Sequence, residues 1–344
     1  MEKVGLALVG LGHWAGVLAR AVTRGAAAEV VNCYSRNPET TSHFQEEHAI
    51  PRSSATLGEL LSDPKVEGVL VTTPNDTHEG VILASLDAGK AVYTDKPIAH
   101  DLRSARRIEG AVNQSGLAFA VGHGARRLAG PRQMRALLEQ GALGGVSIAE
   151  AHFTTRRGLS LGPDQWRYYA DQSPGGPFIQ LGVHHADTLQ YLLGPVATVT
   201  AHSRRLFTPA EVPDTFLAVL EFESGALGYL GTGFAAPPLY QIRILGTDLS
   251  LHYEVDLRFW DQSEVVDAHS SLNRQGRGGK ETVELKATDA LREQVDEFAL
   301  AIRGQATPEV GLDDAIKALA VIEAGLVSVG EGGRTVSLAE LHRG

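Results

Sequence analysis

The sequence predicts an α/β protein in which an N-terminal Rossmann domain with a doubly wound parallel sheet precedes an α+β domain with a largely antiparallel sheet. Three observations support this. Short apolar strands alternate with helices over residues 1–124, a glycine-rich turn follows the first strand, and predicted strands crowd together after residue 125. Strands alternating with helices indicate βαβ units, whereas strands separated by short turns indicate antiparallel pairing. We expect domains at 1–124 and 125–344.

The first domain is predicted from its apolar runs and the helical stretches between them. Its strands are expected at Val4–Val9, Glu29–Tyr34, Val66–Thr72, Ala91–Thr94 and Leu117–Val121. Helices are expected from the first glycine turn to about Arg24, and at Pro38–His48, Thr77–Ala88 and Leu102–Gln114. This rhythm fits right-handed crossovers that cover both faces of a parallel sheet.

The second domain has a different rhythm. Helices are expected at Pro131–Gln140, Gly176–Leu193, Ala290–Arg303 and Asp313–Val329. Strands are expected at Val146–Thr155, Val196–Phe207, Thr215–Glu223, Ala226–Phe234, Tyr240–Leu245, Leu249–Tyr253, Leu257–Trp260 and Thr282–Leu285. The polar, glycine-rich stretch Ser270–Lys280 is predicted to be a flexible loop.

Composition excludes several classes of protein. The 344 residues carry a formal net charge of −10, which disfavours a nucleic-acid partner because such proteins present a basic face. No apolar run reaches the length of a membrane span, so no membrane partner is expected. One cysteine, Cys33, allows neither an internal disulfide nor a cysteine-rich zinc site, which fits a cytoplasmic protein.

The turn after the first strand has the pattern of a dinucleotide site, Gly10-Leu11-Gly12-His13-Trp14-Ala15. The first glycine permits a tight turn, the second lets the backbone approach a pyrophosphate, and the alanine keeps the following helix close to the sheet. The N–H groups and the dipole of that helix favour phosphate. An ordinary glycine turn is the alternative, but the strand and helix on either side favour the cofactor.

The end of the second strand, Tyr34-Ser35-Arg36-Asn37, lacks the carboxylate that usually binds the ribose 2′-hydroxyl of NAD. A serine hydroxyl and a planar guanidinium suit a 2′-phosphate. The sequence therefore favours NADP, with NAD possible if Arg36 only faces solvent.

Two later segments follow strands at the edge where a doubly wound sheet meets its cofactor. They are Thr72-Thr73-Pro74-Asn75 and Asp95-Lys96-Pro97. Asn75 or the neighbouring Asp76 is also suited to capping the next helix. Lys96, held at a strand end before a proline, is a stronger candidate for a functional charge.

Motifs along almost the whole chain, in order, carry a family resemblance. After the glycine turn they are Thr73-Pro74-Asn75-Asp76-Thr77-His78, Ala88–Pro97, Gly182-Val183-His184-His185-Ala186-Asp187, Leu312–Ser328 and Gly332–Val336. With these motifs the chain resembles the Gfo/Idh/MocA oxidoreductases, the family of glucose–fructose oxidoreductase and myo-inositol dehydrogenase. The resemblance implies a second domain whose open-faced sheet builds homodimers or homotetramers.

By motif position, the resemblance assigns Lys96 and His184 to catalysis, with Asp187 nearby, and it adds His78 and Asp95 to the cofactor side. The chain departs from the family at two positions. Asp95 replaces the usual Glu before the lysine, and Gln180 stands four residues before His184, where many sugar dehydrogenases of the family have aspartate.

Chemistry gives these residues plausible roles. Oxidation of a secondary alcohol needs a proton acceptor and a group that stabilises the developing oxyanion. Imidazole titrates near neutrality and suits His184, whereas an ammonium suits Lys96. Asp187, one helical turn on, would orient the imidazole or bind a second substrate hydroxyl. A buried structural histidine and a surface aspartate are the alternative.

A metal site is not expected. His185 would project about 100° away from His184 on a helix, so we expect it to be structural, and no metal-binding spacing of histidines occurs.

Substrate contacts are expected from cations and aromatic residues near the same motifs. The candidates are His123, Arg126, Trp166, Arg167 and Gln180, with Arg127, Arg156, Arg157 and Tyr168 close by in the sequence. The arginines suit a carboxylated or phosphorylated substrate, and equally suit salt bridges at an interface.

We therefore expect an NADP-dependent (or NAD-dependent) dehydrogenase or reductase acting on a secondary alcohol or carbonyl of a sugar, cyclitol or related polyol. In this hypothesis the ammonium of Lys96 and the imidazole of His184 meet over the nicotinamide. A non-catalytic cofactor-binding regulator and a hydrolase that oxidises its substrate transiently are the alternatives.

Overall fold

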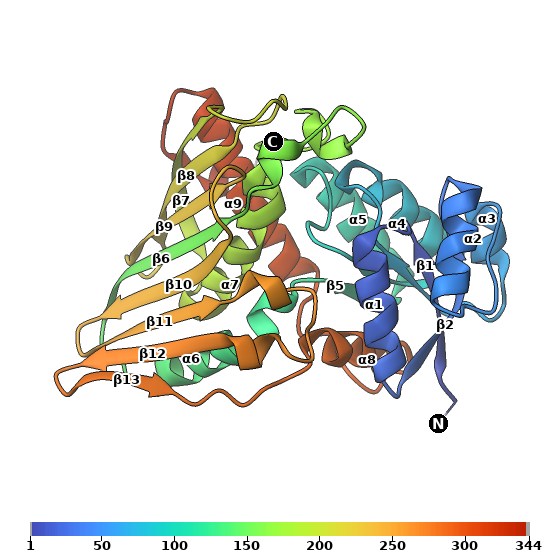
Figure 1. Cartoon of the computed structure of the whole chain (residues 1–344), viewed down its shortest axis with the longest axis horizontal. Helices are drawn as coiled ribbons and strands as arrows, with labels where there is room; N and C mark the ends of the chain where they lie inside the picture. Colours follow the sequence, from blue (N-terminus) through green and yellow to red (C-terminus); the bar gives the residue numbers. More distant parts are fainter. Residues whose placement is uncertain (1, 342–344) are drawn as a thin grey trace. The chain divides into compact units, whose positions relative to one another are not determined.

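The chain forms two compact units. The structure is a computed structural model that describes residues 2–341 (Figure 1). The first unit contains the chain up to Gly124 together with Asp289–Ile316, and the second contains Ala125–Thr288 and the chain from Lys317 onward. The chain leaves the first unit where the sequence predicts the boundary. It returns for residues 289–316, which the sequence analysis assigned to the second domain.

The first unit is the predicted Rossmann fold. Its sheet has the order β2-β1-β3-β4-β5 and all its strands are parallel. The strands are β1 (Val4–Val9), β2 (Ala28–Tyr34), β3 (Gly68–Val71), β4 (Ala91–Thr94) and β5 (Phe119–Val121). The helices are α1 (His13–Arg24), α2 (Pro38–Glu47), α3 (Leu57–Ser62), α4 (His78–Asp87), α5 (Leu102–Ser115) and α8 (Ala290–Ile302). The short α3 was not predicted.

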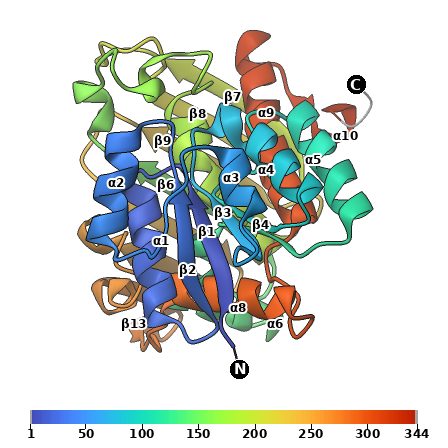
Figure 2. The ribbon, with the colours of Figure 1, turned by 90° about the vertical axis from the view of Figure 1, so that its right-hand side faces the viewer.

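Helices bury this sheet. Every residue of β1 is buried, as expected for a central parallel strand covered on both faces. Helix α1 packs against α8, and Leu18 and Phe298 belong to one apolar core with β1. Helix α4 packs on α5 and on β3 and β4 (Figure 2). The returning segment 289–316 thus completes the core of the first unit.

The second unit is built on a nine-stranded sheet of order β13-β12-β11-β10-β6-β9-β8-β7-β14. Only β6 and β9 pair in parallel among its described neighbours. The strands are β6 (Val146–Thr154), β7 (Val196–Arg204), β8 (Thr215–Phe222), β9 (Leu227–Gly233), β10 (Leu239–Gly246), β11 (Leu249–Val255), β12 (Ser270–Gly276), β13 (Gly279–Val283) and β14 (Val336–Ser337). The helices are α6 (Ala129–Glu139), α7 (Val183–Leu193), α9 (Leu312–Gly330), whose first residues lie in the first unit, and α10 (Leu338–Leu341).

The helices of the second unit cover one face of this sheet. Helix α6 packs on β11 and β12, α7 on β6, and the hydroxyl of Ser328 in α9 accepts the N–H of Ala201 in β7 (Figure 1). Burial in β8 alternates residue by residue, as expected when one face packs and the other does not. No helix among the described residues covers the second face, which we call the open face.

Two local predictions for the second unit were wrong, and a third was right about a helix but not about its first turn. Residues 257–260 form a short helical turn rather than a strand. The predicted loop Ser270–Lys280 is mostly the hairpin β12–β13, which turns between Gly276 and Gly279. Its polar residues suit strands with one solvent-exposed face, so polarity did not mark a loop. The predicted helix 176–193 begins with a π-helical turn, Phe178–Gly182, before α7.

No helix in the described part of the chain is long and apolar enough to span a membrane.

Candidate active-site residues

The glycine turn of the first unit has the geometry that the dinucleotide motif requires. Gly10 has φ +91°, and a Cβ there would lie 2.7 Å from the backbone nitrogen of Thr73. The hydroxyl of Thr72 donates to the carbonyl of Gly10 at 2.6 Å and fixes the turn. Only glycine fits this position, because the conformation is left-handed and the neighbouring backbone is too close for a side chain.

Gly12 and the start of α1 leave room for an anion. A Cβ at Gly12 would meet no atom within 4 Å, and no described side chain caps the helix. Helix α1 carries no acidic residue in its first turn, and Ala15 is fully buried against the sheet. The N–H groups and dipole at this end of the helix therefore suit phosphate.

Polar atoms around the same turn support the fit of a dinucleotide. Within residues 2–341, the buried Nε1 of Trp14, Oγ1 of Thr73 and Nδ2 of Asn75 have no hydrogen-bond partner. Buried polar atoms are normally satisfied, so each of these three calls for an external partner. The backbone of Pro74 leads into a short turn at Asn75–Thr77, and the exposed His13 begins α1. The residues present thus fit a bound dinucleotide.

His78, predicted on the cofactor side, has both ring nitrogens close to backbone carbonyl oxygens. Its Nδ1 lies 2.9 Å from the carbonyl oxygen of Pro97 and its Nε2 lies 2.9 Å from that of Thr73. Burial lowers the pKa of this imidazole, although Asp95 acts in the opposite direction. The histidine therefore joins the two loops that follow β3 and β4, and this geometry favours positioning of the loops over direct contact with a cofactor.

Lys96 follows the carboxyl end of β4 and is half-buried. The N–H of Asp95 donates to the carbonyl of Val71 at 2.8 Å, which extends the sheet pairing as far as the lysine. His123 follows β5 in the same unit and is fully buried. The carboxyl edge of the sheet thus carries the cation that the sequence placed there.

At the end of β2, Ser35 and Arg36 differ in availability. The hydroxyl of Ser35 donates to the carbonyl of Asn37 at 2.9 Å and also contacts Thr41. Arg36 is exposed and forms no ion pair with any described residue. The guanidinium is therefore the more accessible of the two for a phosphate.

In the second unit, His184 lies in the first turn of α7 among aromatic rings. It is 6% exposed, and its ring centroid lies 5.6 Å from that of Phe153 and 5.4 Å from that of Trp260. Sequence reasoning missed both aromatic partners. Trp260 lies 76 residues further along the chain and was expected in a strand, so no local pattern connects it to the histidine.

His185 has the structural role that the sequence predicts. Its Nε2 lies 2.9 Å from the carbonyl oxygen of His152, and burial lowers the pKa of its imidazole to about 4. Its ring also packs on Tyr240. The side chain is therefore neutral at physiological pH.

Arg126 was expected at the substrate, and Asp187 was expected to orient the imidazole or to bind a second substrate hydroxyl. In the structure these two side chains bind each other. The Nε of Arg126 donates to Oδ2 of Asp187 at 2.9 Å, and Nη2 donates to Oδ1. Both residues are buried, and the guanidinium lies over the ring of Tyr191. A bidentate buried pair fixes α7 to the segment before α6, so this geometry favours positioning roles over substrate contact.

Three of the five predicted substrate contacts, Trp166, Arg167 and Gln180, lie together. The Nε of Arg167 donates to Oε1 of Gln180 at 3.2 Å, and its guanidinium lies 4.2 Å from the centroid of the Trp166 ring. Gln180 belongs to the π-helical turn that leads directly to His184. The start of α7 therefore carries the imidazole of His184, with the amide of Gln180 and the guanidinium of Arg167 bonded to each other in the preceding segment.

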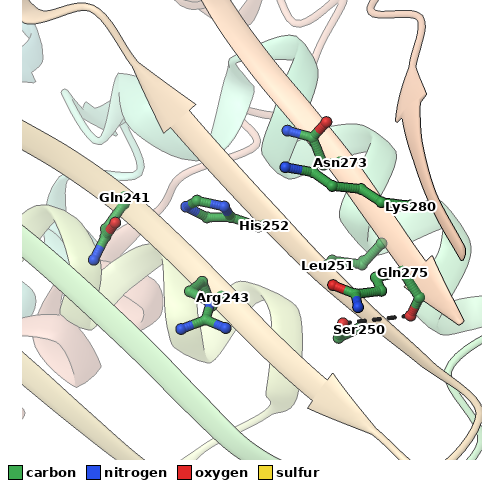
Figure 3. Close-up of a pocket in the computed structure, with 8 residues that line it drawn as sticks. All are labelled: Gln241, Arg243, Ser250, Leu251, His252, Asn273, Gln275 and Lys280. Carbon is green, nitrogen blue, oxygen red and sulfur yellow. Dashed lines mark hydrogen bonds between the residues drawn. The ribbon is translucent and has the colours of Figure 1, made fainter.

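A hollow of about 350 Å³ lies on the open face of the second unit, between β10 and β13 (Figure 3). The residues that line it are remote in sequence from His184. Its lining side chains are Gln241, Arg243, Ser250, Leu251, His252, Asn273, Gln275 and Lys280. No group of three or more metal-binding side chains occurs in residues 2–341.

The two folds and their residues define a two-domain oxidoreductase with an NAD-binding Rossmann unit. Residues 4–123 match the family described as "Oxidoreductase family, NAD-binding Rossmann fold", and residues 132–252 match the "GFO/IDH/MocA C-terminal domain". The chain belongs to the GFO/IDH/MocA family of oxidoreductases.

Similar proteins of known sequence or structure include other oxidoreductases. A crystal structure from Desulfitobacterium hafniense DCB-2, of a protein proposed to be an NADPH-dependent oxidoreductase, is 38% identical, with TM-score 0.95 over 99% of each chain. The 1,5-anhydro-D-fructose reductase of Ensifer adhaerens is 26% identical over 93% of each chain. The 2,7-anhydro-N-acetylneuraminate hydratase of Escherichia coli is 30% identical over 72% of this chain and 67% of that protein.

Proposed function

We propose that this protein is an NADP-dependent oxidoreductase that moves a hydride between nicotinamide and a secondary alcohol, or its carbonyl, in a sugar, cyclitol or related polyol. The observation that carries the proposal is the set of unsatisfied polar atoms around the glycine turn, on the same sheet edge as Lys96. The substrate class is supported by relatives named for anhydrofructose, scyllo-inositol and an anhydro-neuraminate.

In the proposed reaction Lys96 stabilises charge and His184 transfers the proton. When bound, nicotinamide supplies the carbon that gives or takes the hydride. Lys96 donates a hydrogen bond to the reacting substrate oxygen and stabilises its negative charge. His184, packed against Phe153 and Trp260, accepts the proton of that oxygen during oxidation and returns it during reduction.

Phosphate recognition favours NADP. The turn between β1 and α1 and the helix end would hold the pyrophosphate, with Trp14, Thr73 and Asn75 as polar partners. The exposed guanidinium of Arg36 would pair with the 2′-phosphate, and no carboxylate stands beside it in Tyr34–Asn37 to repel that group.

The test of the reaction is a panel of sugars, inositols and aromatic dihydrodiols with NADP⁺ or NADPH, followed by variants with the best substrate. Lys96→Ala should lower kcat by about two to three orders of magnitude while the Kd for NADPH changes little. Lys65→Ala, which removes an exposed lysine of the same unit, is the matched control. Near wild-type turnover in Lys96→Ala would contradict the assigned role.

The test of the base is the pH–rate profile. His184→Asn should abolish the limb of the profile in which oxidation rises as the base loses its proton. If the profile keeps its shape, another group accepts the proton.

The test of the cofactor compares KM values. Arg36→Ala should raise KM for NADP⁺ about tenfold and leave KM for NAD⁺ nearly unchanged, because only the former carries the 2′-phosphate. An equal effect on both cofactors would contradict NADP selectivity.

Two other functions on this fold give different readouts. A non-catalytic regulator would bind NADPH without turnover of any substrate, and the presence of Lys96 and His184 argues against it. A hydrolase using transient oxidation would release product without net change in NADPH absorbance. Product analysis beside absorbance separates all three.

The open face supports association of two or four copies. Ile148, Leu217, Val219 and Leu227 expose 41–54% of their surface on adjacent strands β6, β8 and β9. A second copy would cover this patch by a symmetric contact in which the same surface meets itself. Leu217→Asp should shift the sedimentation coefficient to that of a single chain, with Arg103→Gln as control.

We also propose a cytoplasmic location. Cys33 is the single cysteine, and burial raises the pKa of its thiol to about 11, which suits a structural thiol in a reducing compartment.

A further inference from the structure

Four exposed arginines lie on two loops of the second unit, Arg156 and Arg157 after β6 and Arg204 and Arg205 at the end of β7. The hydroxyl of Thr208 donates to the carbonyl of Gly158 at 2.7 Å and joins the two loops. Figures 1 and 2 show both loops at the same end of the nine-stranded sheet. We call these four side chains the arginine collar.

The charges of the collar are not balanced by carboxylates. Many described arginines pair with carboxylates, as Arg243 does with Glu150 and Arg274 with Glu281. None of the four collar residues forms an ion pair anywhere in residues 2–341. Two of the guanidinium groups donate to backbone carbonyls, Arg204 to Ser203 and Arg205 to Ala210, which leaves their charges without a counter-ion. In a protein of net charge −10, two such arginine pairs on joined loops require an explanation beyond average composition.

Neighbouring acidic groups do not neutralise the collar by direct contact. Oδ2 of Asp214 accepts the N–H groups of Leu206, Phe207 and Thr208 at 2.5–2.9 Å, and its Oδ1 accepts the hydroxyl of Thr215. Burial raises the pKa of the Asp214 carboxyl, but these donors outweigh burial and hold the pKa below its usual range. The Asp214 carboxylate therefore binds the loop backbone and not the collar. Glu211 accepts the N–H of Ala170. The loop is therefore held in place by the side chain of Asp214, which binds its backbone N–H groups.

The collar lies at the end of the sheet near His184, in the first turn of α7. Phe153, in contact with His184, lies near the end of β6, three residues before Arg156. The N–H of Glu211 donates to the carbonyl of Tyr168 at 3.0 Å, which joins the second collar loop to the segment carrying Arg167. The Nε of Arg167 in turn donates to Oε1 of Gln180, in the turn that leads to His184.

One guanidinium of the collar, that of Arg157, is partly desolvated. Arg157 is exposed as a residue, yet surrounding protein lowers the pKa of its guanidinium by desolvation. A cation that is partly desolvated and has no described counter-ion gains more from a bound anion than a fully solvated cation does.

We propose that the arginine collar selects an anionic substrate, a sugar or cyclitol that carries a carboxylate or phosphate, for the reaction at His184. This inference rests on the proposed function and narrows its substrate class. The guanidinium groups attract the anion from solution and bind its oxygen atoms, while the hydroxyl-bearing carbons reach the imidazole. Guanidinium is suited to this task because its planar donors match carboxylate and phosphate oxygens.

The experiment uses matched ligands that differ only in charge. Binding of D-glucose, D-glucuronate and D-glucose 6-phosphate, and of the corresponding galactose series, is measured by calorimetry on the full chain with NADPH present. We expect at least one anionic member to bind about tenfold more tightly than its neutral counterpart. Raising NaCl from about 20 to about 500 mM should remove most of that preference, because salt screens exposed charges. The carboxylate and phosphate arms identify the preferred anion.

Variants assign the preference to the collar. Arg157→Gln and Arg205→Gln should each reduce the anionic preference severalfold without changing affinity for the neutral ligand. Arg103→Gln, which removes an exposed arginine of α5 that has no described ion pair, is the matched control. Unchanged thermal melting would show that the variants fold.

Three results would overturn the inference. They are equal or weaker binding of every anionic member, a preference that survives in both collar variants, or a change in sedimentation in place of a change in affinity, which would identify the collar as a protein interface. Turnover of neutral ligands alone would leave the oxidoreductase proposal standing and remove the collar's role. Collar-dependent binding of anions without turnover of any ligand would support the role of the collar and contradict the oxidoreductase proposal.

Discussion

The two units build their candidate sites in different ways. In the first unit the groups come from consecutive strand ends and from backbone at a glycine turn, so residues close in the motif are close in space. In the second unit His184 is surrounded by Phe153 and Trp260, and Gln180 is held by Arg167, from separate segments of the chain. The first site is a property of a local motif, whereas the second is a property of tertiary packing.

This difference matters for the effect of substitutions. A backbone site depends on a few conformations that only small residues permit, whereas a side-chain site depends on buried partners that must stay paired. We therefore expect substitutions in the second unit to cost stability together with activity. In the first unit, stability and cofactor affinity should be separable.

The largest expected effect is at the buried pair of the second unit. Asp187→Ala leaves the guanidinium of Arg126 buried without its bidentate partner, which should lower the free energy of unfolding by about 3–5 kcal/mol. Urea denaturation measures this loss. The double variant Arg126→Met/Asp187→Leu should be more stable than either single change, because no charge is left alone. A loss below about 1 kcal/mol in the single variant would contradict a structural pair.

The next effect separates folding from binding at the glycine turn. Gly10→Ala places a methyl group 2.7 Å from the Thr73 nitrogen at φ +91°, so we expect about 1–3 kcal/mol of destabilisation. Gly12→Ala meets no atom within 4 Å and should melt like wild type, yet its methyl group would point into the space for pyrophosphate and weaken NADPH binding. Thermal melting and fluorescence titration test both. Similar melting of the two variants would contradict the distinction.

The sequence predicted most of the fold because strands and turns carry local signals. The five strands of the first sheet were found because each is a short apolar run, and β8 and β9 because their ends carry turn residues. The hairpin β12–β13 was missed since its side chains are polar, as a strand on an open face permits. The return of residues 289–316 to the first unit was missed because helix α8 shows only that it has an apolar face.

The candidate site was predicted in the same uneven way. Gly10, Thr73, Asn75 and Lys96 follow from motif position. By contrast, the pairing of Asp187 with Arg126 joins residues 61 positions apart, and no spacing rule connects them. Arg126 had been interpreted as a substrate contact, and Asp187 as a catalytic residue that orients the imidazole or binds a second substrate hydroxyl, because a charged side chain beside a motif gives no sign of its partner.

The smallest effect is a pH dependence that belongs to the second unit. His185 has a pKa of about 4 in the fold and about 6.5 when unfolded, so the unfolded chain binds more protons between these values. The contribution of His185 to the free energy of unfolding is therefore fully present above about pH 6.5 and is lost as the pH falls toward 4. From pH 7.5 to 5.0 this one group should cost about 2 kcal/mol. His185→Gln should flatten that part of the curve in urea denaturation, with His43→Gln, an exposed histidine of the first unit, as control. An identical slope in His185→Gln and wild type would mean that His185 is not buried in its neutral form.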